Sequence, residues 1–203
     1  MRAHFLKRMK HWLRRAPSDA RGKRFVAVIE CILNQNARDV GAACTPAMDF
    51  RLLQLCHEHG VGIVQLPCPE IHTLGFARQR APGQRIRDAL NEDAGIEHCS
   101  TLARDVAERI EVYLEQGYEL VAVLGGNPES PGCAIHEGPD SLSDHAGLFM
   151  RKLQTELRQG GLNPCFLAIR DHDPDLHRID LEAFERLLST TSSALNQSEE
   201  RSQ

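Results

Sequence analysis

Three cysteines of this 203-residue chain stand where their side chains could bind a metal. Each follows an apolar run and lies beside proline or glycine: Cys31 after 25–29, Cys68 in Leu66-Pro67-Cys68-Pro69-Glu70, and Cys133 at the end of the Gly- and Pro-containing stretch 125–133. Thiolates are soft ligands that suit zinc or an iron–sulfur cluster. The spacing contains no CxxC pair, so by itself it equally fits small, half-buried residues at strand ends.

The elements that must position these cysteines alternate along the chain. Continuous apolar runs are typical of parallel strands covered on both faces, and four occur, at 25–29, 61–66, 120–124 and 165–169. Helical periodicity separates or follows them, at 50–56 before Gly60, at 102–114 before Gly117, at 148–157, and from Asp173-Pro174 through Leu187. This order predicts an α/β protein, a three-layer Rossmann-like fold with a mostly parallel sheet of about four strands.

The carboxyl ends of parallel strands meet at one edge of a sheet, where ligands bind. We therefore expect Cys31, Cys68 and Cys133, far apart in sequence, to converge in space. The stretch 71–100 is long for a connection in a compact domain and contains several arginines; it reads equally as a lid over the site or as a surface excursion.

Charge and composition narrow the function classes. The first 24 residues hold nine Lys and Arg but one acid, Asp19, so the rest of a chain with net charge −4 is acidic. We therefore do not expect nucleic acid as a partner, because phosphate binding needs a basic surface and only 5% of residues are aromatic. No stretch approaches the roughly 20 apolar residues of a membrane span. We expect a basic N-terminal extension (1–24), one α/β domain (25–188) and a disordered tail (189–203).

The seven cysteines and the lack of an export signal indicate a reducing, cytoplasmic setting without a disulfide framework. Cys56 and Cys165 fit core positions, Cys99 lies near a predicted helix start, and Cys44, in a loop, is a candidate extra ligand. Asp171-His172-Asp173 follows the fourth strand and could bind a metal, although Asp173 is explained as a helix N-cap. His57-Glu58-His59 reads as a solvated helix end.

The motifs together resemble the thiouracil desulfidase family, and most closely its related, less characterised branch. The resemblance covers about residues 25 to 170. It rests on the motifs Cys31-Ile32-Leu33-Asn34-Gln35-Asn36, Leu66-Pro67-Cys68-Pro69-Glu70, Leu74-Gly75 with Arg78, and Ser130-Pro131-Gly132-Cys133, where Gly132 replaces the family's usual serine. It implies a 4Fe-4S cluster held by Cys31, Cys68 and Cys133, whose fourth iron takes the sulfur of a substrate.

The implied reaction converts the thiocarbonyl of a small thiolated heterocycle to a carbonyl and releases sulfide without net redox change. Such a route needs a group that accepts and returns a proton, and we expect Glu70 to do so with Ser130 as its relay. Glu70 equally fits a first-turn carboxylate and Ser130 a turn-closing hydroxyl. Asn34, Asn36 and Arg38 could bind the heterocycle or satisfy loop backbone.

Two other functions fit the same cysteines. One is a non-catalytic α/β module that binds a ligand or sulfide, and the other is a zinc-dependent hydrolase, in which three thiolates would leave a fourth position for water.

Overall fold

The sheet of this protein consists of four parallel strands. The computed structural model describes residues 19–137 and 141–200, with side chains through residue 190. The strands are β1 (Arg24–Ile29), β2 (Gly62–Leu66), β3 (Glu119–Gly125) and β4 (Cys165–Ala168), in the spatial order β2-β1-β3-β4. All three pairings are parallel. The α/β fold with a four-stranded sheet, predicted from the apolar runs, is confirmed.

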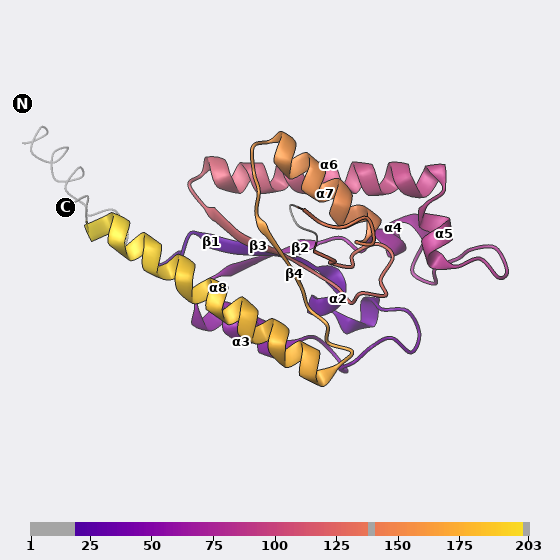
Figure 1. The fold of residues 1–203 in the computed structure, drawn as a ribbon, viewed down its shortest axis with the longest axis horizontal. Helices are drawn as coiled ribbons and strands as arrows, with labels where there is room; N and C mark the ends of the chain where they lie inside the picture. Colours follow the sequence, from indigo (N-terminus) through magenta and orange to yellow (C-terminus); the bar gives the residue numbers. More distant parts are fainter. Residues whose placement is uncertain (1–18, 138–140, 201–203) are drawn as a thin grey trace, which may run out of the picture.

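Helices cover both faces of the sheet (Figure 1). Helices α6 (Asp93–Glu115) and α7 (Leu148–Gln159) pack together on one face, and α3 (Phe50–Glu58) and α8 (Pro174–Glu200) pack on the other. Short helices occupy the connections near the strand ends: α2 (Glu30–Leu33), η1 (Gln35–Ala37), α4 (Pro69–Leu74) and α5 (Ile86–Leu90). The three layers predicted from the alternating pattern are therefore present.

The core is centred on β1, whose six residues are all buried. Val26, Ala27, Val28 and Ile29 have no exposed surface, because β1 lies between two strands and under helices on both sides. This position explains the continuous apolar run, since neither face of the strand meets water. Helix α6 contributes a buried stripe at helical spacing to the same core, namely Cys99, Ala103, Val106 and Ile110.

The stretch 71–100, predicted as a lid or a surface excursion, contains helices of its own. It includes most of α4, the whole of α5 and the first turns of α6. Helix α6 begins at Asp93, so Cys99 lies in its second turn, near the helix start as expected, and is fully buried. The sequence does not indicate this helix start, because Gly95 and the polar residues around it are not typical of a helix. In the structure, Gly95 packs directly against the backbone of Leu90.

Two other expectations differ from the structure. Cys165 is exposed, not in the core, because it is the first residue of β4 and β4 is an edge strand. Helix α8 continues to Glu200, beyond the end predicted at Leu187 and into the predicted disordered tail, since no Gly or Pro interrupts it after Pro174. Most of the basic N-terminal extension, residues 1–18, lies outside the described residues.

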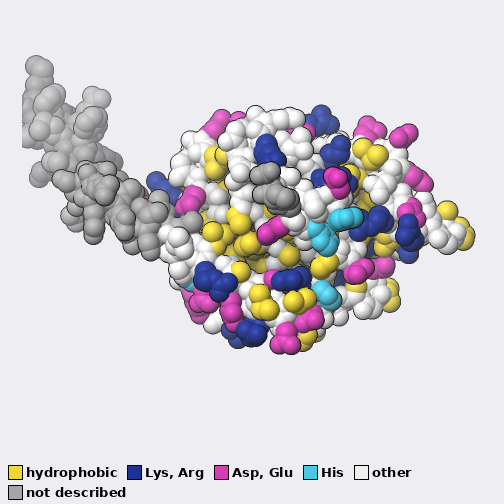
Figure 2. All heavy atoms as spheres, viewed as in Figure 1, with side chains coloured by type: hydrophobic (Ala, Val, Ile, Leu, Met, Phe, Trp, Pro, Cys, Tyr) yellow, Lys and Arg dark blue, Asp and Glu magenta, His cyan; other side chains and the backbone are white. Residues whose placement is uncertain are grey.

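Over residues 19–137 and 141–200, no helix has both the length and the apolar character needed to cross a membrane. On the face shown in Figure 2, acidic and basic side chains are interspersed rather than gathered into one basic patch.

The start of α7 depends on a close backbone contact at Gly147. A Cβ at this position would lie 2.3 Å from the carbonyl carbon and oxygen of Gly132, next to Cys133. We expect Gly147→Ala to lower the free energy of unfolding by about 2 kcal/mol, because the backbones must separate. Gly160→Ala is the control: its Cβ would meet no atom closer than 3.4 Å, so its effect should stay within about 0.5 kcal/mol. Urea unfolding of both variants measures the difference, and equal effects would contradict it.

Candidate functional site

The strand ends bring the three predicted cysteines to one cavity of about 210 Å³, lined by Cys31, Cys68 and Cys133 among others. The register of the sheet explains why Cys31 and Cys68 lie at equivalent positions on neighbouring strand ends. Ile29 of β1 lies opposite Leu66 of β2, and each cysteine comes two residues after its member of this pair. The expectation that the three thiols converge is met by the geometry.

Local structure fixes each thiol differently. Cys31 is half-buried in α2, and Cys68 precedes Pro69, the first residue of α4. The Cys68 N–H donates to Glu30 Oε2 at 3.0 Å, which ties the end of β2 to the end of β1.

A backbone hydrogen bond from Gly126, the residue after β3, positions Cys133. The Gly126 N–H donates to the Cys133 carbonyl at 2.9 Å, and a Cβ on Gly126 would lie 2.9 Å from Cys133 Sγ. A larger residue at position 126 would therefore displace the Cys133 sulfur.

The three thiols differ in acidity. A hydrogen bond from Cys133, with help from the nearby Arg38 guanidinium, lowers the pKa of Cys31. The same bond, together with complete burial, raises the pKa of Cys133 well above its usual range. Burial raises the pKa of Cys68 to about 11. Binding all three as thiolates to a metal would thus release protons.

The cavity offers three soft donors, the thiols of Cys31, Cys68 and Cys133. In the described part of the chain, no three or more His, Cys, Asp or Glu side chains are grouped closely enough to hold one metal ion. Three thiols around one cavity are a soft donor set, and an iron–sulfur cluster would place each cysteine on a different iron. Cys44 is exposed and is not among the residues that line this cavity.

Glu70 and Ser130 lie together beside the thiols. Ser130 Oγ donates to Glu70 Oε1 at 3.2 Å, lies 3.1 Å from Cys133 Sγ, and accepts the Cys133 N–H at 3.2 Å. Glu70 is in the first turn of α4, as its structural interpretation predicts, and its role in proton transfer stays a prediction. Burial raises the pKa of Glu70, which makes its protonated form accessible nearer to neutral pH.

Arg78 is a buried residue of the site that the sequence marked only through the family resemblance. Its Nη2 donates to the Ala37 carbonyl at 2.6 Å, its Nη1 donates to the Phe76 carbonyl at 2.7 Å, and its Nε lies 3.7 Å from Glu70 Oε2. Arg78 has a φ of 47°, a left-handed conformation that non-glycine residues rarely adopt and that concentrates at functional sites.

The three predicted substrate-binding residues separate in the structure. Asn34 Oδ1 accepts from the backbone N–H and the side-chain Nδ2 of Asn36, at 3.2 and 3.0 Å, and neither asparagine is among the cavity-lining residues. These two side chains therefore form hydrogen bonds within their own loop. Arg38 does line the cavity. Sequence reasoning missed other lining residues, among them Asp39, Asn127 and Glu129, which lie in loops with no regular pattern.

The remaining motifs have structural roles. Asp173 Oδ1 accepts from the backbone N–H groups of Asp175 and Leu176, at 2.9 and 3.1 Å, which makes it the N-cap of α8 as expected. His57 and Glu58 end α3 and His59 caps it.

Comparison with known proteins gives one distant likeness. The chain is 26% identical over 124 residues to an uncharacterized protein of Methanocaldococcus jannaschii, a match that spans 61% of this chain and 76% of that protein. No family model matches the chain, and no solved structure matches it.

Arg78 is expected to stabilise the loop between α4 and α5. Arg78→Met should lower the free energy of unfolding by about 3 kcal/mol, since Glu70 loses its charged neighbour and two carbonyls lose donors. Arg80→Met is the matched control, because Arg80 also donates to two carbonyls, those of Gln84 and Arg78, but is exposed. It should cost less than about 1 kcal/mol. Chemical denaturation compares the two, and a similar loss for both would show that burial of Arg78 is unimportant.

Proposed function

We propose that this protein is an iron–sulfur-dependent desulfidase that removes sulfur from a small thiolated heterocycle. The observation that supports the proposal is the juxtaposition, in one small cavity, of three thiols with a buried carboxylate and a serine hydroxyl: Cys31, Cys68, Cys133, Glu70 and Ser130. A soft ligand set is suited to a soft sulfur substrate. A cavity of about 210 Å³ accommodates a small molecule, and the interspersed acidic and basic side chains on the face shown in Figure 2 favour such a partner over nucleic acid.

The reaction balances as a hydrolysis. The C=S bond breaks, a C=O bond forms with the oxygen of water, and both water protons leave with the sulfur as hydrogen sulfide. When bound by three cysteines, a 4Fe-4S cluster supplies an iron without a protein thiolate, which acts as a Lewis acid toward the thiocarbonyl sulfur.

The residues of the chain supply binding and proton transfer. Cys31, Cys68 and Cys133 would hold the cluster at the strand ends. Glu70 accepts a proton from the attacking water and returns it to the departing sulfur, with Ser130 Oγ, 3.2 Å from Glu70 Oε1, as the bridge. The raised pKa of Glu70 suits this exchange, because a proton carrier works best when both of its forms are accessible. This chemistry needs reduced thiols, and we accordingly assign the protein to the cytoplasm.

Metal analysis tests the cluster. Protein purified without oxygen should contain about four irons and four acid-labile sulfides per chain. Cys31→Ser, Cys68→Ser and Cys133→Ser should each lose most of this iron. Cys165→Ser should retain it, because Cys165 is exposed and does not line the cavity. Protein without iron that also resists reconstitution would overturn the proposal, and stoichiometric zinc would favour the hydrolase instead.

Sulfide release tests the chemistry. We expect Glu70→Gln, which is nearly the same size but cannot take up the proton, to lower sulfide release from 2-thiouracil or a related thiolated base by about 100-fold or more. Its iron content should stay unchanged. Unaltered turnover would remove Glu70 from the mechanism. A wild-type protein that binds sulfide but converts no thiolated base would favour the non-catalytic module.

A further inference from the structure

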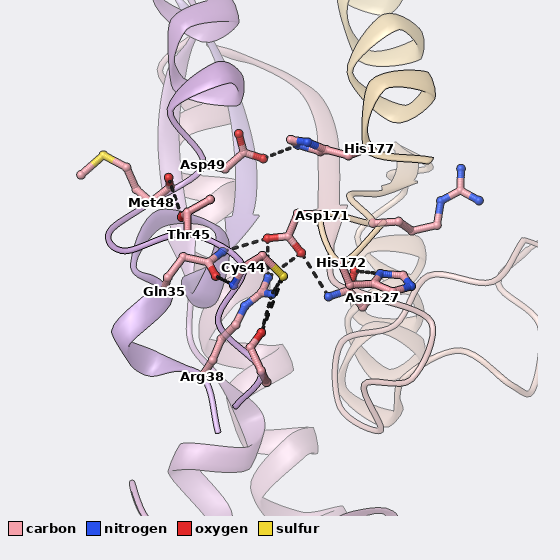
Figure 3. A network of polar contacts seen from close by, with 12 residues as sticks. Gln35, Arg38, Cys44, Thr45, Met48, Asp49, Asn127, Asp171, His172 and His177 are labelled. Atoms are coloured by element: carbon pink, nitrogen blue, oxygen red, sulfur yellow. Dashed lines mark hydrogen bonds and ion pairs between the residues drawn. The ribbon is translucent and has the colours of Figure 1, made fainter. Parts of the chain in front are cut away.

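A buried carboxylate outside the cavity organises one of its walls. Asp171 follows β4, and its side chain is 4% exposed. Its oxygens accept hydrogen bonds from three side chains of two other strand-end loops (Figure 3): Gln35 Nε2 at 2.8 Å, Arg38 Nη2 at 2.7 and 2.8 Å, and Asn127 Nδ2 at 3.1 Å. The sequence suggested a metal ligand here, but protein donors occupy this carboxylate.

Two of these donors line the cavity, whereas Asp171 does not. Arg38 and Asn127 are lining residues, and they come from the loops after β1 and β3. Asp171 therefore reaches any bound molecule only through them. Arg38 and Asp171 form an ion pair with both side chains at least 94% buried, so removing one partner would leave an unpaired buried charge.

Further contacts fix the orientation of both lining residues. Asn127 Oδ1 lies 2.6 Å from His172 Nδ1, so with Nδ2 donating to Asp171 the amide cannot turn over without losing both bonds. Arg38 Nη1 donates to the Ala42 carbonyl at 3.0 Å and to Cys44 Sγ at 3.1 Å. Cys44 thus helps to hold Arg38.

These two residues offer a ligand one hydrogen-bond donor and one positive charge. Nδ2 of Asn127 carries two hydrogens, and Arg38 carries an Nε–H in addition to those on Nη1 and Nη2. Among the residues that the structure describes, one hydrogen of Asn127 Nδ2 has no protein acceptor, and the Arg38 guanidinium, which also hydrogen-bonds Cys31, keeps its positive charge beside the cavity. A fixed donor next to a fixed positive charge is suited to an acceptor such as a ring carbonyl oxygen.

We propose that Asp171 is a positioning residue for substrate recognition, which holds Arg38 and Asn127 as a wall of donors for the carbonyl oxygen of a thiolated heterocycle. This inference rests on the proposed function for the identity of the ligand. It predicts that a ring with both a carbonyl and a thiocarbonyl binds better than a ring with the thiocarbonyl alone.

The test measures binding and turnover separately in cluster-loaded protein. Equilibrium dialysis gives the dissociation constants of 2-thiouracil and of its carbonyl-free analogue 2-mercaptopyrimidine, and sulfide release gives KM and kcat. Asp171→Asn should weaken 2-thiouracil binding and raise KM by about tenfold, the effect of one charged hydrogen bond. The value of kcat should change by less than about threefold, and the preference over 2-mercaptopyrimidine should disappear.

Asp180→Asn is the matched control for a purely structural effect. Asp180 is 7% exposed and forms an ion pair with Arg170, the residue before Asp171, but it does not line the cavity. This variant should lose stability without changing either dissociation constant. Asn127→Ala removes one donor directly and should reproduce the loss of binding if Asp171→Asn does not fold. The double variant should be weaker than wild type by less than the product of the two single effects, because both act on one contact.

Each outcome separates this inference from the proposed function. If Asp171→Asn, or Asn127→Ala in its place, binds 2-thiouracil as wild type does, the donor wall is wrong while the desulfidase reaction stands. If wild type binds 2-thiouracil in an Asp171-dependent way but releases no sulfide, the reaction is wrong and the donor wall stands. If wild type does not bind 2-thiouracil, the donor wall is wrong whatever the turnover of other bases.

Discussion

The pairing register of the central strand β1 is the constraint on which the site depends. β1 is hydrogen-bonded on both sides, with Ile29 opposite Leu66 and Val28 opposite Leu124. Its burial on both faces fixes this register, because a slip by one residue would exchange the two faces of the strand and disrupt the packing on each. Such a slip would also move Cys31 by about 3.3 Å along the sheet relative to Cys68. The positions of the cysteines therefore follow from the packing of apolar residues that have no chemistry of their own.

The loops beyond the strands are joined by carboxylates, each shared between segments. Glu30 accepts the Cys68 N–H, Asp171 joins the loops after β1, β3 and β4, and Asp49 caps α3 while accepting from His177 of α8 at 2.7 Å. A buried carboxylate without donors is costly, so each of these groups stabilises the fold only while its partner loops stay in place. The bonds of Asp171 also fix Arg38 and Asn127, which line the cavity, so the stability of the loops and the geometry of the site are coupled.

The sequence predicts the features of this protein that leave a local pattern. The four strands are visible because each is a short apolar run, and the convergence of Cys31, Cys68 and Cys133 follows from the parallel topology alone. Contacts between distant residues leave no such pattern: Asp171 and Arg38 are 133 residues apart, and nothing at either position indicates the other. Local patterns also fail where the burial of a residue depends on neighbouring elements. The apolar run that contains Cys165 predicts a core strand, but the strand lies at the edge of the sheet and Cys165 is exposed.

The charges around the thiols explain why such a site can exist in a buried cavity. Three thiolates away from water would be strongly unfavourable without compensation. The hydrogen bond from Cys133, together with the Arg38 guanidinium, lowers the pKa of Cys31 on one side, and Arg78 Nη2 lies 3.9 Å from Cys68 Sγ on the other. Each arginine is itself held by a carboxylate, Arg38 by Asp171 and Arg78 by Glu70. The positive charges thus stay fixed beside the sulfurs instead of turning toward solvent, and a cationic metal group in the cavity would complete the balance.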